Sequence, residues 1–165
     1  MKKLKHLLIL TMLISSACNQ NKIFEKHKKI KDYIWYKSEK IKFEVPVKDS
    51  INNYDICIAV RHITEYPFAN LNTGLTIYYP NRKKEYNEYK LSLRDKDGDF
   101  KGDVLGNIWD ISVPVKKNVH FLQKGIYKFK IENLMPEYEK TPGIIEIGLI
   151  IRKSEQVTHD LSRGL

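Results

Sequence analysis

Cysteine is scarce in this sequence. Among 165 residues there are two, Cys18 and Cys57. Because the N-terminal pattern described below assigns Cys18 to lipid attachment, Cys57 has no intrachain partner and a disulfide framework is excluded. Cys57 lies in the strand-like run YDICIAV, where a small buried residue fits, and the alternative is a reactive free thiol. We predict that it is buried and that the fold rests on its hydrophobic core.

Motifs of the common enzyme classes are also missing. The sequence has no G-x-S-x-G nucleophile elbow, no H-E-x-x-H and no phosphate-binding glycine loop. Its five histidines share no ligand spacing. We therefore predict a protein that is not an enzyme, with no catalytic, cofactor or metal site, no nucleic-acid partner and no evident small-molecule substrate. A pair of carboxylates that meet only in space keeps a hydrolase as a remote alternative.

No apolar run near the N-terminus is long enough to cross a bilayer, which takes about 20 residues. The run LLILTMLI has eight residues, follows the positively charged MKKLKH and precedes SSAC. This is the layout of a secretory signal. Because it ends on a cysteine it also resembles a bacterial lipobox, with Ser15 where Leu is usual, and it predicts cleavage before Cys18 and acylation of that residue. The alternative is an ordinary signal peptide with a chance cysteine.

Basic residues outnumber acidic ones by 29 to 20, for a formal net charge of +9. The predicted signal peptide, residues 1–17, contains three of the lysines, so the mature chain carries +6. We expect a lipidated N-terminus and basic tether at 18–34, one domain at 35–153, and a polar tail at 154–165. The tether's lysines either lie against anionic lipid head groups or belong to a solvated spacer. The aromatic cluster at 33–36 is expected to pack on the domain edge rather than to stack on a ligand.

Period-two alternation of apolar and polar residues dominates the domain. Turns rich in Pro, Gly, Asn and Asp separate the alternating segments, and no amphipathic helix, internal repeat or low-complexity tract is evident, although 133–140 has room for one helical turn. The expected fold is all-β, a single antiparallel β-sandwich of about seven to eight strands. The predicted strands are KIKFEVPV, YDICIAVR, GLTIYYP, YKLSL, ISVPV, GIYKFKIEN and GIIEIGLIIRK.

The run DKDGDFKGDVLGNIWD, residues 95–110, is either a metal-binding loop or a tight turn. Counted from Asp95 as a helix-loop-helix calcium loop, it has Phe100 where Gly is needed and Gly106 where a bidentate Glu is needed. Asp-Gly is itself a strong turn signal, because Gly98 can adopt positive φ and the aspartate before it can bond the backbone two residues on. We favour the turn. A calcium site of another geometry would use Asp95, Asp97, Asp99 and Asp103, and the expected apolar inner side of the turn is Val104, Leu105, Ile108 and Trp109.

The run RHITEYPFANL, residues 61–71, is expected to bridge two strands, because Pro67 has a fixed φ and biases Tyr66 toward an extended conformation. We expect Arg61 and Asn70 to hold it through hydrogen bonds to backbone groups. The segment is either a stabilising loop or a partner site.

Four segments follow one another behind the lipobox: YDICIAVRHITEYPFANL, LRDKDGDFKGDVLGNIWD, KKNVHFLQKGIYKFKIENLM and PGIIEIGLIIRK. In this order they resemble the gliding motility lipoprotein GldH family, over a range from about Trp35 to Lys153. Two features depart from the family pattern. The tail SEQVTHDLSRGL lies beyond the similarity, and Asp99 stands where the family tends to carry a basic or neutral residue.

The resemblance implies a non-enzymatic cell-envelope lipoprotein that supports movement of surface adhesins and is associated with the type IX secretion and gliding machinery. Its partners would be the membrane, through lipid on Cys18, and proteins of that machinery. Because NQNK rather than an acidic run follows Cys18, we expect the domain to face the periplasm. The alternative is a lipid-anchored module that binds glycan or peptidoglycan, favoured by an exposed row of rings, whereas buried rings favour the assembly subunit. The candidate rings are Trp35, Tyr36, Tyr66, Trp109 and Tyr138.

Overall fold

A computed structural model of the protein describes residues 21–155, so that Cys18, the predicted signal peptide and the predicted tail from residue 156 lie outside the described part. The predicted antiparallel β-sandwich is confirmed, with eleven strands rather than seven or eight. No helix in the described part is long and apolar enough to span a membrane. The elements are β1 (Lys22–Lys29), η2 (Lys31–Tyr33), β2 (Ile34–Tyr36), β3 (Ile41–Val47), β4 (Asn53–Ile63), β5 (Asn70–Tyr78), β6 (Lys84–Ser92), β7 (Asp103–Leu105), β8 (Ile108–His120), β9 (Gly125–Asn133), β10 (Lys140–Pro142) and β11 (Ile144–Lys153).

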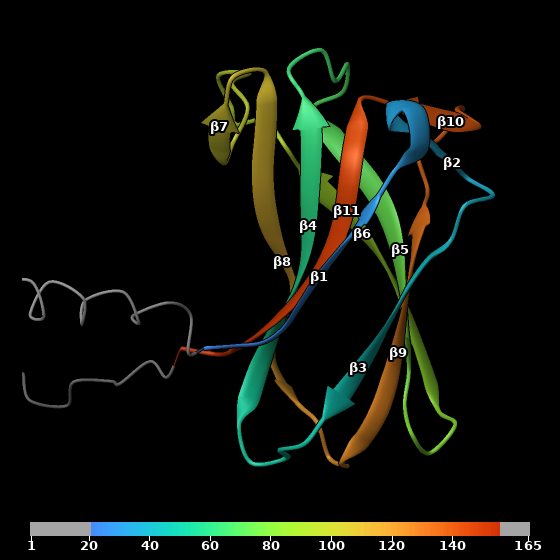
Figure 1. Cartoon of the computed structure of the whole chain (residues 1–165), viewed down its shortest axis with the longest axis vertical. Coiled ribbons are helices and arrows are strands. Elements are labelled where there is room, and N and C mark those ends of the chain that lie inside the picture. The colour runs from blue at the N-terminus through green and yellow to red at the C-terminus, as the bar shows by residue number, and fades with distance from the viewer. Residues whose placement is uncertain (1–20, 156–165) are drawn as a thin grey trace, which may run out of the picture.

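Two sheets form the layers of the sandwich (Figure 1). One has five strands in the order β1-β11-β4-β8-β7, the other has four in the order β3-β9-β5-β6, and the pair β10-β2 lies at one end. Rings join the layers: Phe24 of β1 meets Phe43 of β3 edge-on at 6.3 Å, and Phe121 lies between Tyr54 of β4 and Tyr127 of β9. The core is therefore the space between the two sheets, as in other sandwiches.

All seven predicted segments are strands. In β3 the alternation is complete, with every second residue buried from Ile41 to Val47. Strands β4 and β11 lie inside the five-stranded sheet and are buried on both faces. The second face holds a small cluster of Cys57, Ala59 and Ile150. The predicted burial of Cys57 is confirmed, and that burial raises the pKa of its thiol.

The predicted tether is wrong from Lys22 onward. Residues Lys22–Lys29 form β1, an edge strand that pairs with β11 from Lys22↔Arg152 to Lys29↔Glu146. Its lysines point to solvent, and Phe24 alone among its side chains is buried. A lysine-rich strand at the edge protects a sheet from pairing with other chains, which explains why this segment is charged although it belongs to the fold. The domain therefore begins before residue 35.

Of the aromatic cluster at 33–36, Trp35 packs in the domain as predicted, whereas Tyr33 and Tyr36 are 52% and 47% exposed. Trp35 is completely buried, and its indole N–H donates to the Glu39 carbonyl at 3.1 Å. Buried Asn133 donates to the Trp35 carbonyl at 2.8 Å and to the Thr141 hydroxyl at 2.9 Å, and so joins β9 to both strands of the β10-β2 pair. Residues 134–139, for which a helical turn was possible, form an irregular turn instead.

The sandwich has two ends, which we call proximal and distal. At the proximal end β1 begins and β11 ends: the Lys153 N–H donates to the Asn21 carbonyl at 2.7 Å, and the Ser154 N–H donates to the Asn53 carbonyl at 2.9 Å. The loops 48–52, 79–83 and 121–124 connect strands below that point, at the bottom of Figure 1. At the distal end, uppermost in Figure 1, lie the loop 64–69, the segment 93–107 and the β10-β2 pair.

Candidate partner-binding surface at the distal end

The loop 64–69 bridges β4 and β5, as predicted. Tyr66 holds it in place: its hydroxyl donates to the Asn70 carbonyl at 2.9 Å, and its backbone N–H donates to the Ile63 carbonyl at 3.1 Å. The ring is 1% exposed, and burial raises the pKa of the Tyr66 hydroxyl. Asn70 therefore contributes through its backbone carbonyl.

The expected role of Arg61 is wrong. Its guanidinium bonds two carboxylates rather than backbone groups, because Arg61 lies in β4 on the face opposite the core, beside β8 and β11. The distances are 2.7 Å from Nε to Asp110 Oδ1, 3.0 Å from Nη2 to Asp110 Oδ2 and 3.2 Å from Nη1 to Glu146 Oε2. The hydrogen bond to Asp110 raises the pKa of Arg61. This two-pronged geometry is specific to arginine and ties three strands together at their distal ends.

The start of the acidic run is a turn. The Asp95 carboxylate accepts the backbone N–H groups of Asp97 at 2.9 Å and Asp99 at 3.0 Å, and Gly98 has φ 91°. The organising side chain is thus Asp95, one aspartate earlier than expected from the Asp-Gly pair. Within residues 21–155 no three His, Cys, Asp or Glu side chains are grouped so that they could hold a metal ion.

The expected inner side of this run is wrong for two of its residues. Strand β7 forms a hairpin with β8 in which Leu105 pairs with Ile108 around Gly106, which has φ 64°. Strand β7 has three residues and lies at the edge of its sheet at the distal end, so the other sheet does not cover its side chains. Val104 is 53% exposed and Leu105 is 84% exposed, so the hairpin presents two aliphatic side chains to solvent.

A row of rings supports the hairpin and the loop 64–69. Neighbouring centroids along it lie 4.6–5.6 Å apart. The Arg94 guanidinium lies 3.4 Å from the Phe100 centroid. At the centre of the row, His62 is fully buried, Nδ1 bonds the Ile63 carbonyl at 2.9 Å, and burial lowers the pKa of the imidazole. In order, the rings are Trp109, Phe100, His62, Tyr66, Phe68 and Tyr138.

This row is not a flat platform for a sugar. Neighbouring planes are inclined by 45–76°, and its central members are in the core. Of the five rings considered for glycan stacking, Trp35 and Tyr66 are buried, Trp109 is half-buried, and Tyr36 and Tyr138 are 47% and 45% exposed. The row instead connects loops that are distant in sequence.

Beside the row lies an apolar groove between the loop 64–69 and β10. Its apolar lining is Pro67, Phe68, Tyr138 and Pro142, and the rings of Phe68 and Tyr138 are in contact. Glu137, Glu139 and Lys140 form its polar rim. We call the hairpin tip and this groove, which lie at opposite ends of the row of rings, together the distal patch (Figure 1). The residues that line the groove come from two segments that are far apart in the sequence, which explains why no local sequence pattern predicted the groove.

Comparison with known proteins places the chain in a family. The model of the GldH lipoprotein family matches residues 22–151, well over half of the chain. The protein belongs to the GldH lipoprotein family. The match begins at Lys22, the first residue of β1, in agreement with the structural boundary of the domain.

Two curated proteins are similar over most of their length. The Gliding motility lipoprotein GldH homolog of Christiangramia forsetii is 26% identical over 153 residues, covering 89% of this chain and 93% of its own. The Gliding motility lipoprotein GldH of Flavobacterium johnsoniae is 27% identical over 138 residues, covering 84% and 85%. Among solved structures, a chain from the structure of infectious bursal disease virus Gx strain aligns with 83% of this chain and 34% of its own, at 13% identity and a TM-score of 0.29. A similarity at that level supports no conclusion about fold or function.

Proposed function

We propose that this protein is a non-enzymatic, lipid-anchored component of the cell envelope that supports gliding motility by binding a protein partner at its distal patch. Family membership and the names of both relatives support the gliding role. The finer assignment is to the type IX secretion and gliding machinery that moves surface adhesins. It rests on the family resemblance.

The observation that carries the binding mode is the hairpin tip. Exposed aliphatic side chains are usually scattered singly, whereas here Val104 and Leu105 follow one another in β7 and are exposed on its two faces at the end of the hairpin. The half-buried Trp109 pairs with Val104 and donates from its indole N–H to the Thr64 hydroxyl at 3.2 Å, which fixes the ring behind the tip. Val104 thus lies beside an aromatic ring that is fixed on one face of the hairpin, and Leu105 is exposed on the other face; apolar side chains beside an aromatic ring support an interface at this tip.

The anchor in this proposal is Cys18, with residues 1–17 as a signal peptide that is removed and with the domain facing the periplasm. A glycan-binding module is supported less well. Two of its five candidate rings are in the core, and the rings of the distal row are tilted against one another.

The test replaces the tip of the hairpin in a gliding strain that lacks its own copy of this gene. Leu105→Asp should abolish colony spreading while the protein accumulates normally and melts at an unchanged temperature, because the side chain contributes little to the core. Leu105→Met is the matched control and should glide, since it keeps an apolar side chain of similar volume. Affinity purification of the tagged, lipidated protein should recover gliding or secretion components that Leu105→Asp loses. Normal gliding of Leu105→Asp would contradict a partner at this patch.

A further inference from the structure

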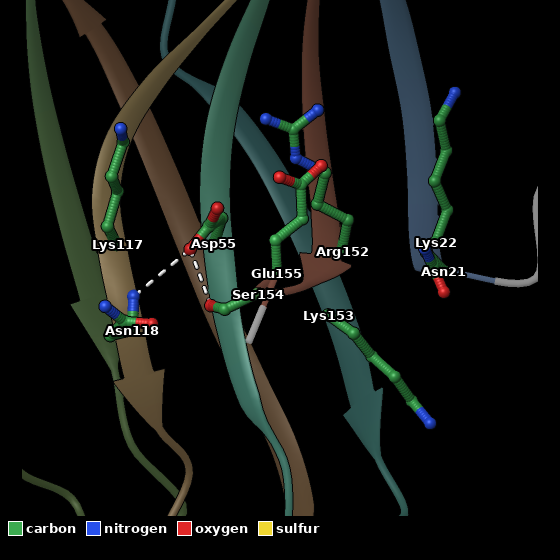
Figure 2. A pocket seen from close by; sticks show the side chains of 9 residues that line it. All are labelled: Asn21, Lys22, Asp55, Lys117, Asn118, Arg152, Lys153, Ser154 and Glu155. Atoms are coloured by element: carbon green, nitrogen blue, oxygen red, sulfur yellow. Dashed lines mark hydrogen bonds between the residues drawn. The ribbon is translucent and has the colours of Figure 1, made fainter. Parts of the chain in front are cut away.

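The outer face of the five-stranded sheet has a basic hollow near the proximal end. Lys22 of β1, Lys117 of β8 and the consecutive Arg152 and Lys153 of β11 line it (Figure 2). The acidic residues on its wall are Asp55 and Glu155. Asp55 is engaged within the protein: it accepts the Ser154 hydroxyl at 2.6 Å and the Asn118 backbone N–H at 3.1 Å.

The arrangement of these cations favours a surface over a small anion. Figure 2 shows the ends of Lys22, Lys117, Arg152 and Lys153 spread apart rather than converging on one point. A free phosphate binds where donors converge, as at a nest of N–H groups. Lys22 is paired with Glu25 at 2.7 Å. The separated cations that match a plane of many negative charges are therefore Lys117, Arg152 and Lys153.

Two exposed aliphatic side chains stand beside the hollow. Ile51, in the loop 48–52, is 86% exposed, and Leu122, in the loop 121–124, is 81% exposed. Asn53, at the start of β4, accepts the Ser154 N–H and pairs with His120, at the end of β8. Ile51 is two residues before Asn53, and Leu122 is two residues after His120, so both side chains are close to strand ends near the hollow. The Asp49 carboxylate accepts the Ile51 backbone N–H at 2.8 Å, so the turn that presents Ile51 is ordered by its own hydrogen bond.

The covalent chain limits where this end can be. Asn21 is held to Lys153 by a backbone hydrogen bond, and Cys18 is three residues earlier. Three residues extend over at most about 11 Å. If Cys18 carries lipid, Asn21 cannot be farther than this from the membrane surface. The +6 charge of the mature chain would reinforce its attraction to anionic lipid.

We infer that the proximal end docks on the membrane surface, with its basic hollow on anionic phospholipid head groups and Ile51 and Leu122 in the interface. This rests on the lipidation of Cys18 proposed above. Docking would fix the orientation of the domain: β8, with 13 residues, is about 43 Å long, and it would hold the distal patch away from the lipid. Cations within reach of anionic lipid and inserted aliphatic side chains are the two terms that strengthen surface binding.

The test removes the acyl chains, so that only the protein surface binds. Mature chain 18–165 with Cys18→Ser is sedimented with vesicles of equimolar phosphatidylglycerol and phosphatidylcholine, and with vesicles of phosphatidylcholine alone. We expect binding to the anionic vesicles, weakened by salt. The variant Lys117→Glu/Arg152→Glu/Lys153→Glu should bind more weakly by about fivefold for each charge removed. Ile51→Ser/Leu122→Ser should weaken binding by roughly fivefold and leave the salt dependence unchanged.

The matched control reverses three exposed lysines at the distal end: Lys31→Glu/Lys96→Glu/Lys140→Glu. It has the same net charge as the proximal variant and should keep most of its affinity, provided that both have the melting temperature of the parent. Equal losses in the two triple variants, or no preference of the parent for anionic vesicles, would overturn the inference. Palmitate labelling of native Cys18 tests the lipid anchor separately. A protein that is not labelled but still binds anionic vesicles through the proximal end would refute the anchor and not the membrane-binding surface.

Discussion

Arg61 and Asp110 face each other across β4 and β8 through two nearly parallel hydrogen bonds of 2.7 and 3.0 Å. The third hydrogen bond of the same guanidinium reaches Glu146, which is 9% exposed, so the arginine also neutralises a carboxylate in the sheet. The distal ends of three neighbouring strands thus depend on one side chain.

Arg61→Ala should destabilise the domain by about 1 kcal/mol, because Arg61 and Asp110 are partly exposed while Glu146 would lose its cation. Arg61→Lys should restore only part of this, since an ammonium group cannot bond both oxygens in a fork. Denaturant unfolding of the three proteins measures the differences. A stable Arg61→Ala protein that fails to support gliding would instead assign Arg61 to the partner surface.

Gly102→Ala should be far more damaging than substitution of the neighbouring glycines of the same segment. Gly102 has φ +104°, and an added Cβ would lie 2.1 Å from the Asp110 carbonyl oxygen, which is backbone and cannot move away cheaply. Gly98, at φ +91°, has open space around a Cβ and is the matched control. We expect a cost of about 1–2 kcal/mol for Gly98→Ala and a larger loss for Gly102→Ala, by thermal melting. Similar melting temperatures would show that the segment adapts to the side chain.

Calcium should not stabilise the protein. The Asp95 carboxylate already accepts two backbone N–H groups, so its charge is used within the turn. Asp95→Ala should therefore lower the melting temperature, whereas Asp97→Asn and Asp99→Asn should leave it unchanged. Calorimetric titration of the mature chain with calcium should give no heat. Micromolar binding that is lost in Asp97→Asn and Asp99→Asn would establish a metal site.

The alternation of apolar and polar residues predicted the strands, because it indicates that one face of a strand is buried. It failed to predict strands that bury few side chains. Strand β3 alternates fully, while β1 buries only Phe24 and therefore looked like a charged tether. Strands β2, β7 and β10 have three residues each, too few for a period to show, and they are held by backbone pairing to partners. The distal patch was hidden for a different reason. Leu105 was expected inside because it is apolar, although its strand lies at a sheet edge.

Acid should weaken the contact between the sheets at Glu85. This side chain of β6 bonds Lys116 of β8 and accepts the Tyr79 hydroxyl at 2.8 Å. The hydrogen bond from Lys116 holds the pKa of Glu85 below its ordinary value, while burial and the same carboxylate raise the pKa of Tyr79 to about 12. Because the unfolded state takes up the proton first, the stabilisation is present above the ordinary pKa and is lost as pH falls through the lowered one.

The expected result is a fall in the free energy of unfolding between about pH 5 and pH 3. Glu85→Gln should be less stable than the parent at pH 7 and should lose less on acidification. The acid sensitivity left in that variant comes from Glu25, Glu132 and Asp49, since the pKa of each is lowered as well. Parallel pH curves for the two proteins would exclude Glu85 as a source of the effect.

Cys18→Ser should leave the protein as an uncleaved precursor. The lipobox pattern places the only N-terminal cysteine directly after the small residues of the signal, so the variant should not be labelled by a clickable palmitate analogue and should not be processed by the lipoprotein peptidase. Cys57→Ser is the control, because Cys57 is completely buried in the folded domain and should not affect labelling. Continued labelling of Cys18→Ser would refute the anchor. Protease treatment of whole cells tests orientation: a domain in the periplasm should survive it, whereas loss of the domain would place it on the cell surface.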